Sequence, residues 1–93
     1  MVIVVNESLP KPVAGWLTQW FVEVHHNVYV GTMNARVRQE VILYLKRNKG
    51  PSGVAVCVYT KPSEVGYVIE PIGRPSMAYA SFDGLILPMT VLP

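Results

Sequence analysis

The segment VAVCVY, residues 54–59, decides the fold of this chain because it places apolar side chains on both alternating faces of a strand. The run VIVV, residues 2–5, repeats that pattern near the amino terminus. An antiparallel sheet with one solvated face alternates apolar with polar residues. Helices packed on one face would therefore leave a second apolar face to be covered. A helix from the tail could cover it, but the tail does not have a helical pattern, so we expect a second copy of the chain.

Two helices are predicted between the strands. The first has an apolar stripe at helical spacing, made of Val13, Trp16, Leu17, Trp20, Phe21 and Val24. We expect Ser8 to cap this helix and Asn34 to cap the second one. The inward stripe of the second helix consists of Val37, Val41, Tyr44 and Leu45. Its last turn is basic and is followed by Gly50, which is typical of a helix end.

Further strands are predicted over residues 28–30, 54–60 and 67–72, the last two forming a hairpin. The order strand, helix, strand, helix, strand, strand predicts an α+β fold, a ferredoxin-like βαβ sandwich with both helices on one side and a homodimer formed through the sheet faces. A flavodoxin-like sheet with helices on both faces is the alternative, but it needs a longer chain.

The tail, GLILPMTVLP at residues 84–93, is predicted to be an added strand or a partner-docking arm. Pro88 cannot donate a ladder hydrogen bond, so such a strand belongs at an edge or crosses onto a neighbour. The length of 93 residues supports one domain, over residues 1–93.

The composition is short of charge. Charged residues make up 15% of the chain and apolar residues 51%, whereas about 25% charged is usual. This shortage also favours a face covered by a partner. The single Cys57 excludes an intramolecular disulfide, which suggests a reducing cytoplasmic compartment. No apolar run approaches the ~20 residues of a membrane span, and no basic region precedes the first apolar stretch, so we expect neither a membrane segment nor a signal peptide.

Glu7 follows the first strand, where a carboxylate could hold Mg²⁺. One carboxylate rarely suffices for this ion. If the two first strands pair in the dimer, however, the second copy would supply another Glu7. The alternative interpretation of Glu7 is an ordinary turn residue.

Other catalytic patterns are weak. His25 and His26 are adjacent and would point to opposite sides of a strand, so they are expected to face solvent rather than chelate together. Cys57 is expected to be a small core residue. The serines lack a nucleophile-elbow pattern, and no glycine-rich phosphate loop is present.

Basic residues are the remaining candidates. They are Lys11, Arg36, Arg38, Lys46, Arg47, Lys49, Lys61 and Arg74. Lysines at a helix end are most often solvated caps. The formal charge of +2 is too small to indicate a nucleic-acid partner from one copy. In a two-fold dimer these basic residues would be present twice. They could then bind the phosphates of a nucleic acid without recognising its base sequence.

The chain resembles the Cas2 family of CRISPR adaptation proteins, in its type I-E subtype. The resemblance covers almost the whole sequence and rests on IVVNE (3–7), WFVEVHHNVYVG (20–31), NARVR (34–38) and FDGLIL (82–87). It implies a ferredoxin-like homodimer at the centre of a complex with the Cas1 integrase. The dimer would hold prespacer duplex DNA during spacer acquisition, through Lys11, Arg74, Lys46 and Arg47. The tail strand would dock on Cas1, through Asp83, Leu85, Leu87, Met89 and Val91.

The alternative implied by the resemblance is a metal-dependent endonuclease acting on RNA or DNA, because some relatives are reported to use an acid where Glu7 stands. Many members have Asp at that position, and the adaptor role in this subtype is thought not to need the acid. Two arginines expected early in the first helix are Pro12 and Ala14 here. A regulatory module that binds a small ligand is a third possibility with little support in the sequence.

Overall fold

The computed structural model describes residues 1–61 and 66–74 of the chain. Its elements, in chain order, are β1 (Val2–Asn6), α1 (Lys11–Leu17), β2 (Val22–His25), β3 (Val28–Gly31), α2 (Ala35–Asn48), β4 (Ala55–Tyr59) and β5 (Val68–Ile72). The predicted α+β class is confirmed. The predicted tail strand, residues 84–93, lies outside the described residues.

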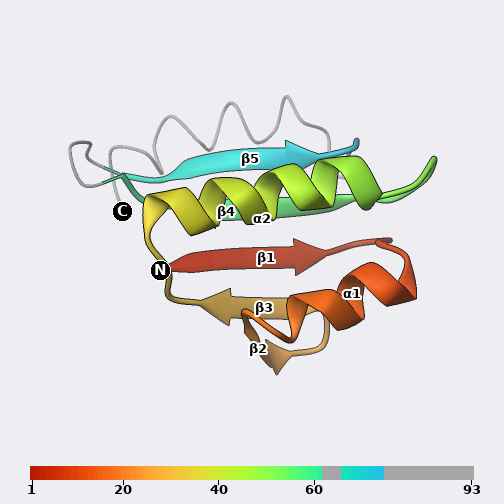
Figure 1. Ribbon diagram of the computed structural model, residues 1–93, viewed down its shortest axis with the longest axis horizontal. Helices are drawn as coiled ribbons and strands as arrows, with labels where there is room; N and C mark the ends of the chain where they lie inside the picture. Colours follow the sequence, from red (N-terminus) through yellow and green to blue (C-terminus); the bar gives the residue numbers. More distant parts are fainter. Residues whose placement is uncertain (62–65, 75–93) are drawn as a thin grey trace.

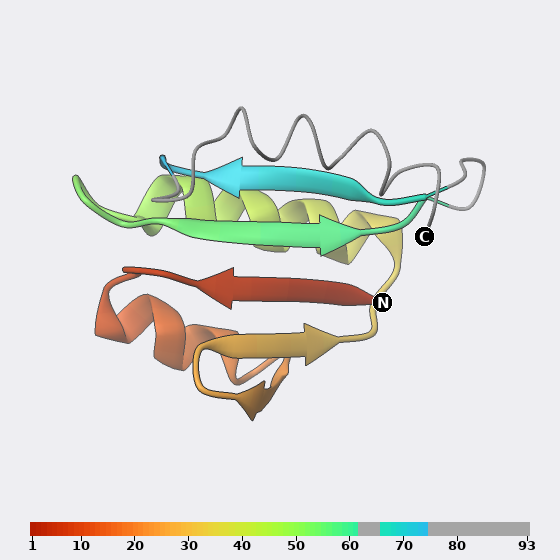
Figure 2. The ribbon, with the colours of Figure 1, turned by 180° about the vertical axis from the view of Figure 1, so that it is seen from behind.

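The strands form one sheet in the order β2-β3-β1-β4-β5, and every neighbouring pair is antiparallel. The first strand of the chain, β1, therefore lies in the middle of the sheet. Both helices lie on one face (Figure 1), and the view from behind shows the strands in front of them (Figure 2). The predicted hairpin is confirmed as β4 and β5, paired from Ala55 opposite Ile72 to Tyr59 opposite Val68.

The prediction that the first helix continues through Phe21 to Val24 is wrong. The helix ends at Leu17, and the residues after Phe21 form β2, which pairs with β3. The stretch VEVH has β-branched residues at alternate positions, which suit a strand as well as a helical stripe. Pairing with β3 decides between the two. The turn that joins them contains Asn27 at φ 61°, a left-handed conformation that asparagine tolerates better than most residues.

The prediction that Ser8 caps α1 is also wrong. The helix begins at Lys11 after Pro10, which offers no side-chain hydrogen bond to the first turn. The Ser8 hydroxyl instead donates to the carbonyl of Ser52 at 2.9 Å. The helix starts later than the sequence suggested because Pro12 fits its first turn, where no intrahelical N–H bond is lost.

The second helix matches its prediction. The side chain of Asn34 accepts a hydrogen bond from the backbone N–H of Val37 at 2.9 Å, which caps the amino terminus. Lys46 and Arg47 occupy the last turn, where positive charge complements the helix dipole. Leu45 is fully buried against the sheet.

The two faces of the sheet differ in their surroundings. The covered face lies under the helices, and most of its residues are buried: Val2, Val4, Tyr29, Ala55, Cys57, Tyr59 and Ile72. Asn6, Val68 and Glu70 lie on the same face and are partly buried. The open face carries apolar residues in two rows across the strands, and none of them is buried: Ile3, Val5, Val28, Val30, Val56, Val58, Ile69 and Pro71. No helix among the described residues lies on the open face. The prediction of a sheet that is apolar on both faces is therefore confirmed.

Within residues 1–61 and 66–74, neither helix has the length and hydropathy that a transmembrane helix requires.

Candidate nucleic-acid interface

Segments that are far apart in the sequence meet at one end of the molecule. In Figure 1 the carboxyl ends of β1, β5 and α2 and the start of α1 all lie at the right. The backbone N–H groups of Glu7 and Ser8 both donate to the carbonyl of Val54, at 3.0 and 2.9 Å. A Cβ added at Gly73 would lie 2.4 Å from the carbonyl oxygen of Gly53, so only glycine allows this approach. These contacts join the loops that follow β1, α2 and β5.

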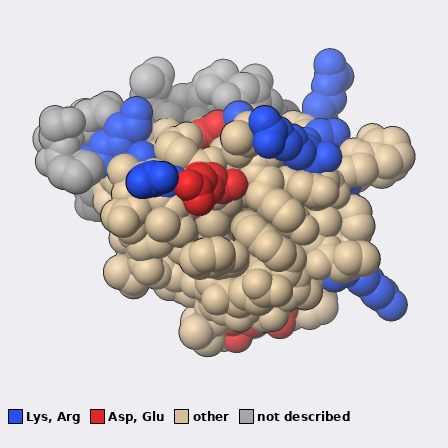
Figure 3. Space-filling view, viewed as in Figure 1, with Lys and Arg blue, Asp and Glu red and all other residues tan. Residues whose placement is uncertain are grey.

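This end, which we call the basic end, carries Lys11, Lys46, Arg47, Lys49 and Arg74. Lys11 is the exposed first residue of α1, and Arg74 is exposed just after β5. Figure 3 shows Lys and Arg atoms along the right edge of the molecule, where no Asp or Glu atom is visible in that view. Lys11 begins α1, Lys46 and Arg47 lie in the last turn of α2 and Arg74 follows β5, so the four residues that the sequence predicted to contact DNA belong to segments at this end of the molecule. Cations gathered in this way can bind phosphate groups.

Lys46 differs from its neighbours at the basic end because its charge is already paired. Its Nζ atom donates to Glu70 Oε2 at 2.6 Å, and the hydroxyl of Tyr59 donates to Glu70 Oε1 at 3.1 Å. Arg47 is exposed in the same helical turn. Of these two residues, Arg47 is therefore the better placed to contact a phosphate.

These contacts shift three pKa values. Partial burial alone would raise the pKa of Glu70, but hydrogen bonds from Lys46 and Tyr59 outweigh it and lower that pKa. The hydrogen bond to Glu70 raises the pKa of Lys46. Burial, followed by the hydrogen bond to Glu70, raises the pKa of Tyr59. Lys46 and Glu70 therefore remain an ion pair at neutral pH.

Arg38 extends this network into the core. It is only 8% exposed, and its guanidinium lies 4.1 Å from the centre of the Tyr59 ring, a cation–π contact. Its Nε atom has no hydrogen-bond partner among the described residues. From the sequence, Arg38 was expected only as one of the candidate cations, and Glu70 was not singled out. Glu70 could have been noticed in the sequence because it is the one charged residue in the apolar strand VIEPI. In the structure it lies on the covered face, opposite Cys57.

Glu7 lies at the basic end, exposed, just after β1. The neighbouring oxygens are engaged elsewhere: the side chain of Asn6 accepts from the N–H of Leu9, and the Ser8 hydroxyl donates to Ser52. The described residues contain no group of three or more His, Cys, Asp or Glu side chains able to hold a metal ion. A site shared by two Glu7 residues stays a prediction.

The other sequence candidates have simple roles or lie elsewhere. Burial raises the pKa of the Cys57 thiol to about 12, so it is a protonated core residue at neutral pH, as predicted. His25 and His26 are exposed at the end of β2 and in the turn after it. The predicted docking residues lie outside the described part of the chain: Asp83, Leu85, Leu87, Met89 and Val91.

Comparison with known families confirms the Cas2-like part of the resemblance seen in the sequence, and the type I-E subtype stays a prediction. A family model described as CRISPR-associated protein (Cas_Cas2CT1978) matches residues 1–87 of the 93-residue chain. The match includes the whole sheet, both helices and the basic end. The chain therefore belongs to this Cas2-like family of CRISPR-associated proteins.

Proposed function

We propose that this protein is a non-catalytic, homodimeric adaptor of CRISPR adaptation, of the type I-E subtype, which holds prespacer duplex DNA while the Cas1 integrase acts on it. Membership of a Cas2-like family supports a role in adaptation. The observation that supports the DNA-binding part is that three exposed cations, Lys11, Arg47 and Arg74, stand on segments at the same end of the molecule. Such residues contact phosphates and carry no sequence information, which suits the capture of varied DNA.

The homodimer is proposed to form through the open face. The strand order β2-β3-β1-β4, with both helices on one side, supports a ferredoxin-like arrangement to which β5 is added. Two rows of half-exposed valine, isoleucine and proline side chains cross the open face. Burying them against the same face of a second copy removes apolar surface from water, at about 25 cal/mol for each Å². A two-fold pair would also carry two basic ends.

The integrase is proposed to bind the tail, from Asp83 to Leu92. This part of the proposal rests on the sequence pattern and the family, because those residues lie outside the described structure. Deleting residues 84–93 should abolish co-purification of Cas1. A truncated chain that retains Cas1 would place the docking surface elsewhere.

Duplex retention tests the basic end. We expect Lys11→Glu combined with Arg74→Glu to weaken binding of a DNA duplex and to make its salt dependence shallower. The slope of log K against log salt should fall by about 0.9 for each phosphate that the variant no longer neutralises. The matched control is Arg36→Glu with Lys61→Glu, which makes the same charge change near the start of α2 and the end of β4. Equal weakening by both pairs would contradict the assignment.

Glu7→Ala separates the adaptor from an endonuclease. We expect this variant to support spacer acquisition at the normal level, because an adaptor needs no metal-binding acid. The second measurement is cleavage of RNA and duplex DNA with and without Mg²⁺. Magnesium-dependent cleavage by the unmodified protein that disappears in Glu7→Ala would replace the adaptor proposal with the nuclease.

A further inference from the structure

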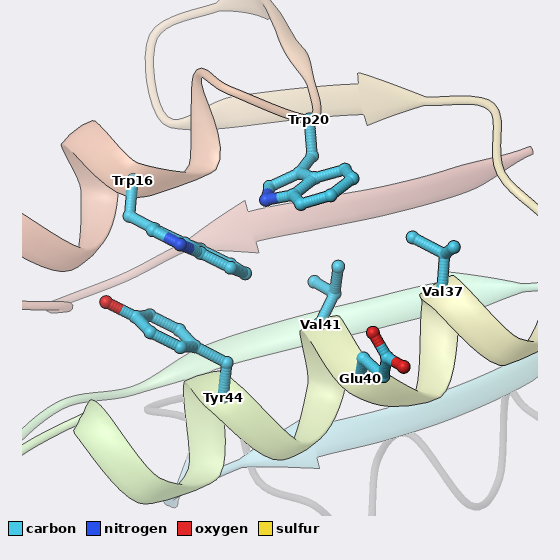
Figure 4. A pocket seen from close by; sticks show the side chains of 6 residues that line it. All are labelled: Trp16, Trp20, Val37, Glu40, Val41 and Tyr44. Atoms are coloured by element: carbon cyan, nitrogen blue, oxygen red, sulfur yellow. The ribbon is translucent and has the colours of Figure 1, made fainter.

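An aromatic groove lies between the two helices, away from the open face. Its walls are Trp16 and Trp20 from the α1 region and Val37, Glu40, Val41 and Tyr44 from α2, and its volume is about 210 Å³. Figure 4 shows these side chains, with Trp20 projecting toward α2 from the segment after α1. The volume is below the ~300 Å³ of the smallest usual small-molecule pockets, so the groove suits a single side chain better than a drug-sized ligand.

The aromatic walls are held in place by one another. The rings of Trp16 and Tyr44 are stacked, with centroids 3.7 Å apart and planes 12° from parallel. Trp20 is tilted by 51° from Trp16 at a centroid distance of 6.2 Å. Trp20 remains 47% exposed, so a large part of its surface is available to a bound group.

Charge selects the kind of group that fits. Among the described residues that line the groove, Glu40 is the one that carries a charge. It has a weak competing partner in Arg36, whose Nε atom lies 3.7 Å from Glu40 Oε1 while both side chains are largely exposed. Aromatic faces and a carboxylate both attract a cation. The same carboxylate repels the phosphates of a nucleic acid.

We infer that this groove binds an arginine side chain of a protein partner. A planar guanidinium can stack on the Trp20 ring and donate hydrogen bonds to Glu40 at the same time, whereas the rounder ammonium of lysine stacks poorly. The aliphatic part of the arginine would lie against Val37 and Val41. Because the groove is separate from the basic end and the open face, its test is independent of the proposed function.

The direct test is titration with N-acetyl-arginine amide, followed by tryptophan fluorescence and by the indole N–H resonances of Trp16 and Trp20. We expect saturable binding with Kd on the order of 1 mM, the range for one small group. N-acetyl-citrulline amide has nearly the same shape without the charge, and it should bind at least about tenfold more weakly. Equal binding of the two probes, or no shift of the indole resonances, would overturn the inference.

Three variants sharpen this test. Glu40→Gln should weaken binding of the arginine probe about fivefold, and Trp20→Ala should weaken it further. Arg36→Gln is the matched control, since it removes the competing cation and should leave binding unchanged or slightly tighter. All three positions are exposed, so the fold should persist.

Two outcomes would contradict the inference. If Glu40→Gln does not change binding of the arginine probe, the groove is not a cation site. Stronger shifts with a single-stranded oligothymidine would identify a base-stacking surface instead.

Discussion

The covered and open faces of the sheet are built from similar apolar side chains but have different neighbours. On β1, Val4 is fully buried under the helices, whereas the adjacent Val5 is 39% exposed on the other side. On β4 the same alternation separates buried Cys57 from half-exposed Val58. A run of consecutive apolar residues thus indicates that both faces need covering, but it does not say which face its own helices will take.

The two faces also contribute to different kinds of stability. The covered face stabilises the fold of one chain through contacts with α1 and α2. In the proposed homodimer, the open face would instead stabilise the association of two copies. Substitutions on the two faces should therefore affect different measurements, the free energy of unfolding in one case and the association constant in the other.

The largest expected effect is on the covered side. Leu45→Ala in α2 removes a fully buried side chain and should lower the free energy of unfolding by about 3 kcal/mol, because apolar burial is reduced and a cavity is left behind. Urea unfolding measures it. Leu43→Ala on the same helix is the control, because Leu43 is exposed and should change stability by less than about 0.5 kcal/mol. Equal effects would mean that α2 packs differently.

The second-largest effect should be on dimer formation through the open face. Val58→Lys places a charge in the middle of the open face and should raise the dimer Kd at least about a hundredfold, or about 2.7 kcal/mol, because the charge would be buried without a partner. Sedimentation at several concentrations measures it. Thr32→Lys, at an exposed position outside the strands, should leave Kd unchanged. An unmodified protein that sediments only as a 10.3 kDa species would rule out the homodimer.

A smaller effect should distinguish adjacent residues of one strand. Val4→Ala should cost about 2 kcal/mol of unfolding free energy, since it removes fully buried methyl groups and leaves a cavity. Val5→Ala should cost about 0.5 kcal/mol when measured at concentrations where the chain is monomeric. Similar values for the two variants would mean that the open face is covered within one chain.

The smallest effect concerns the polar edge of the covered face. Glu70→Gln should lower stability at pH 7 by about 1 kcal/mol, because it removes the ion pair with Lys46, which is half exposed. The pKa of Glu70 is lowered in the folded chain, so its contribution is present above the unfolded value of about 4.3 and is lost as the pH falls through the folded value. The stability difference between the two proteins should therefore disappear in acid. A constant difference down to about pH 3, below the unfolded value, would contradict the role of its charge.

Much of the fold could be predicted from short-range signals. Asn34, the stripe through Leu45 and the basic last turn defined α2, because capping and amphipathic spacing act within one helix. The β4–β5 hairpin could be predicted for the same reason, because its two strands follow one another in the sequence. The end of α1 could not be predicted, since the valines of β2 satisfy both a helical and a strand period and only their pairing with β3 selects the strand.

The residues of the candidate site could be predicted from the sequence, but their positions relative to one another could not. Lys11, Arg47 and Arg74 could be named from the sequence, yet their location at one end depends on loops that are distant in the chain. The loops after β1 and α2 are joined by hydrogen bonds to the carbonyl of Val54, and the loop after β5 by the close approach of Gly73 to Gly53. The pairing of Lys46 with Glu70 spans 24 residues and had no local signal. The aromatic groove also required the structure, because Trp16 and Tyr44 stack across two helices.

The sequence by itself determined that this chain has two amphipathic helices, an apolar sheet with both faces unsuited to water, and a surplus of cations near element ends. Those properties follow from side-chain chemistry and local periodicity. Only the tertiary structure decided which face the helices cover, where α1 stops, and which charges meet. Those outcomes depend on contacts between distant segments, whose free energies outweigh the small local preferences of the chain.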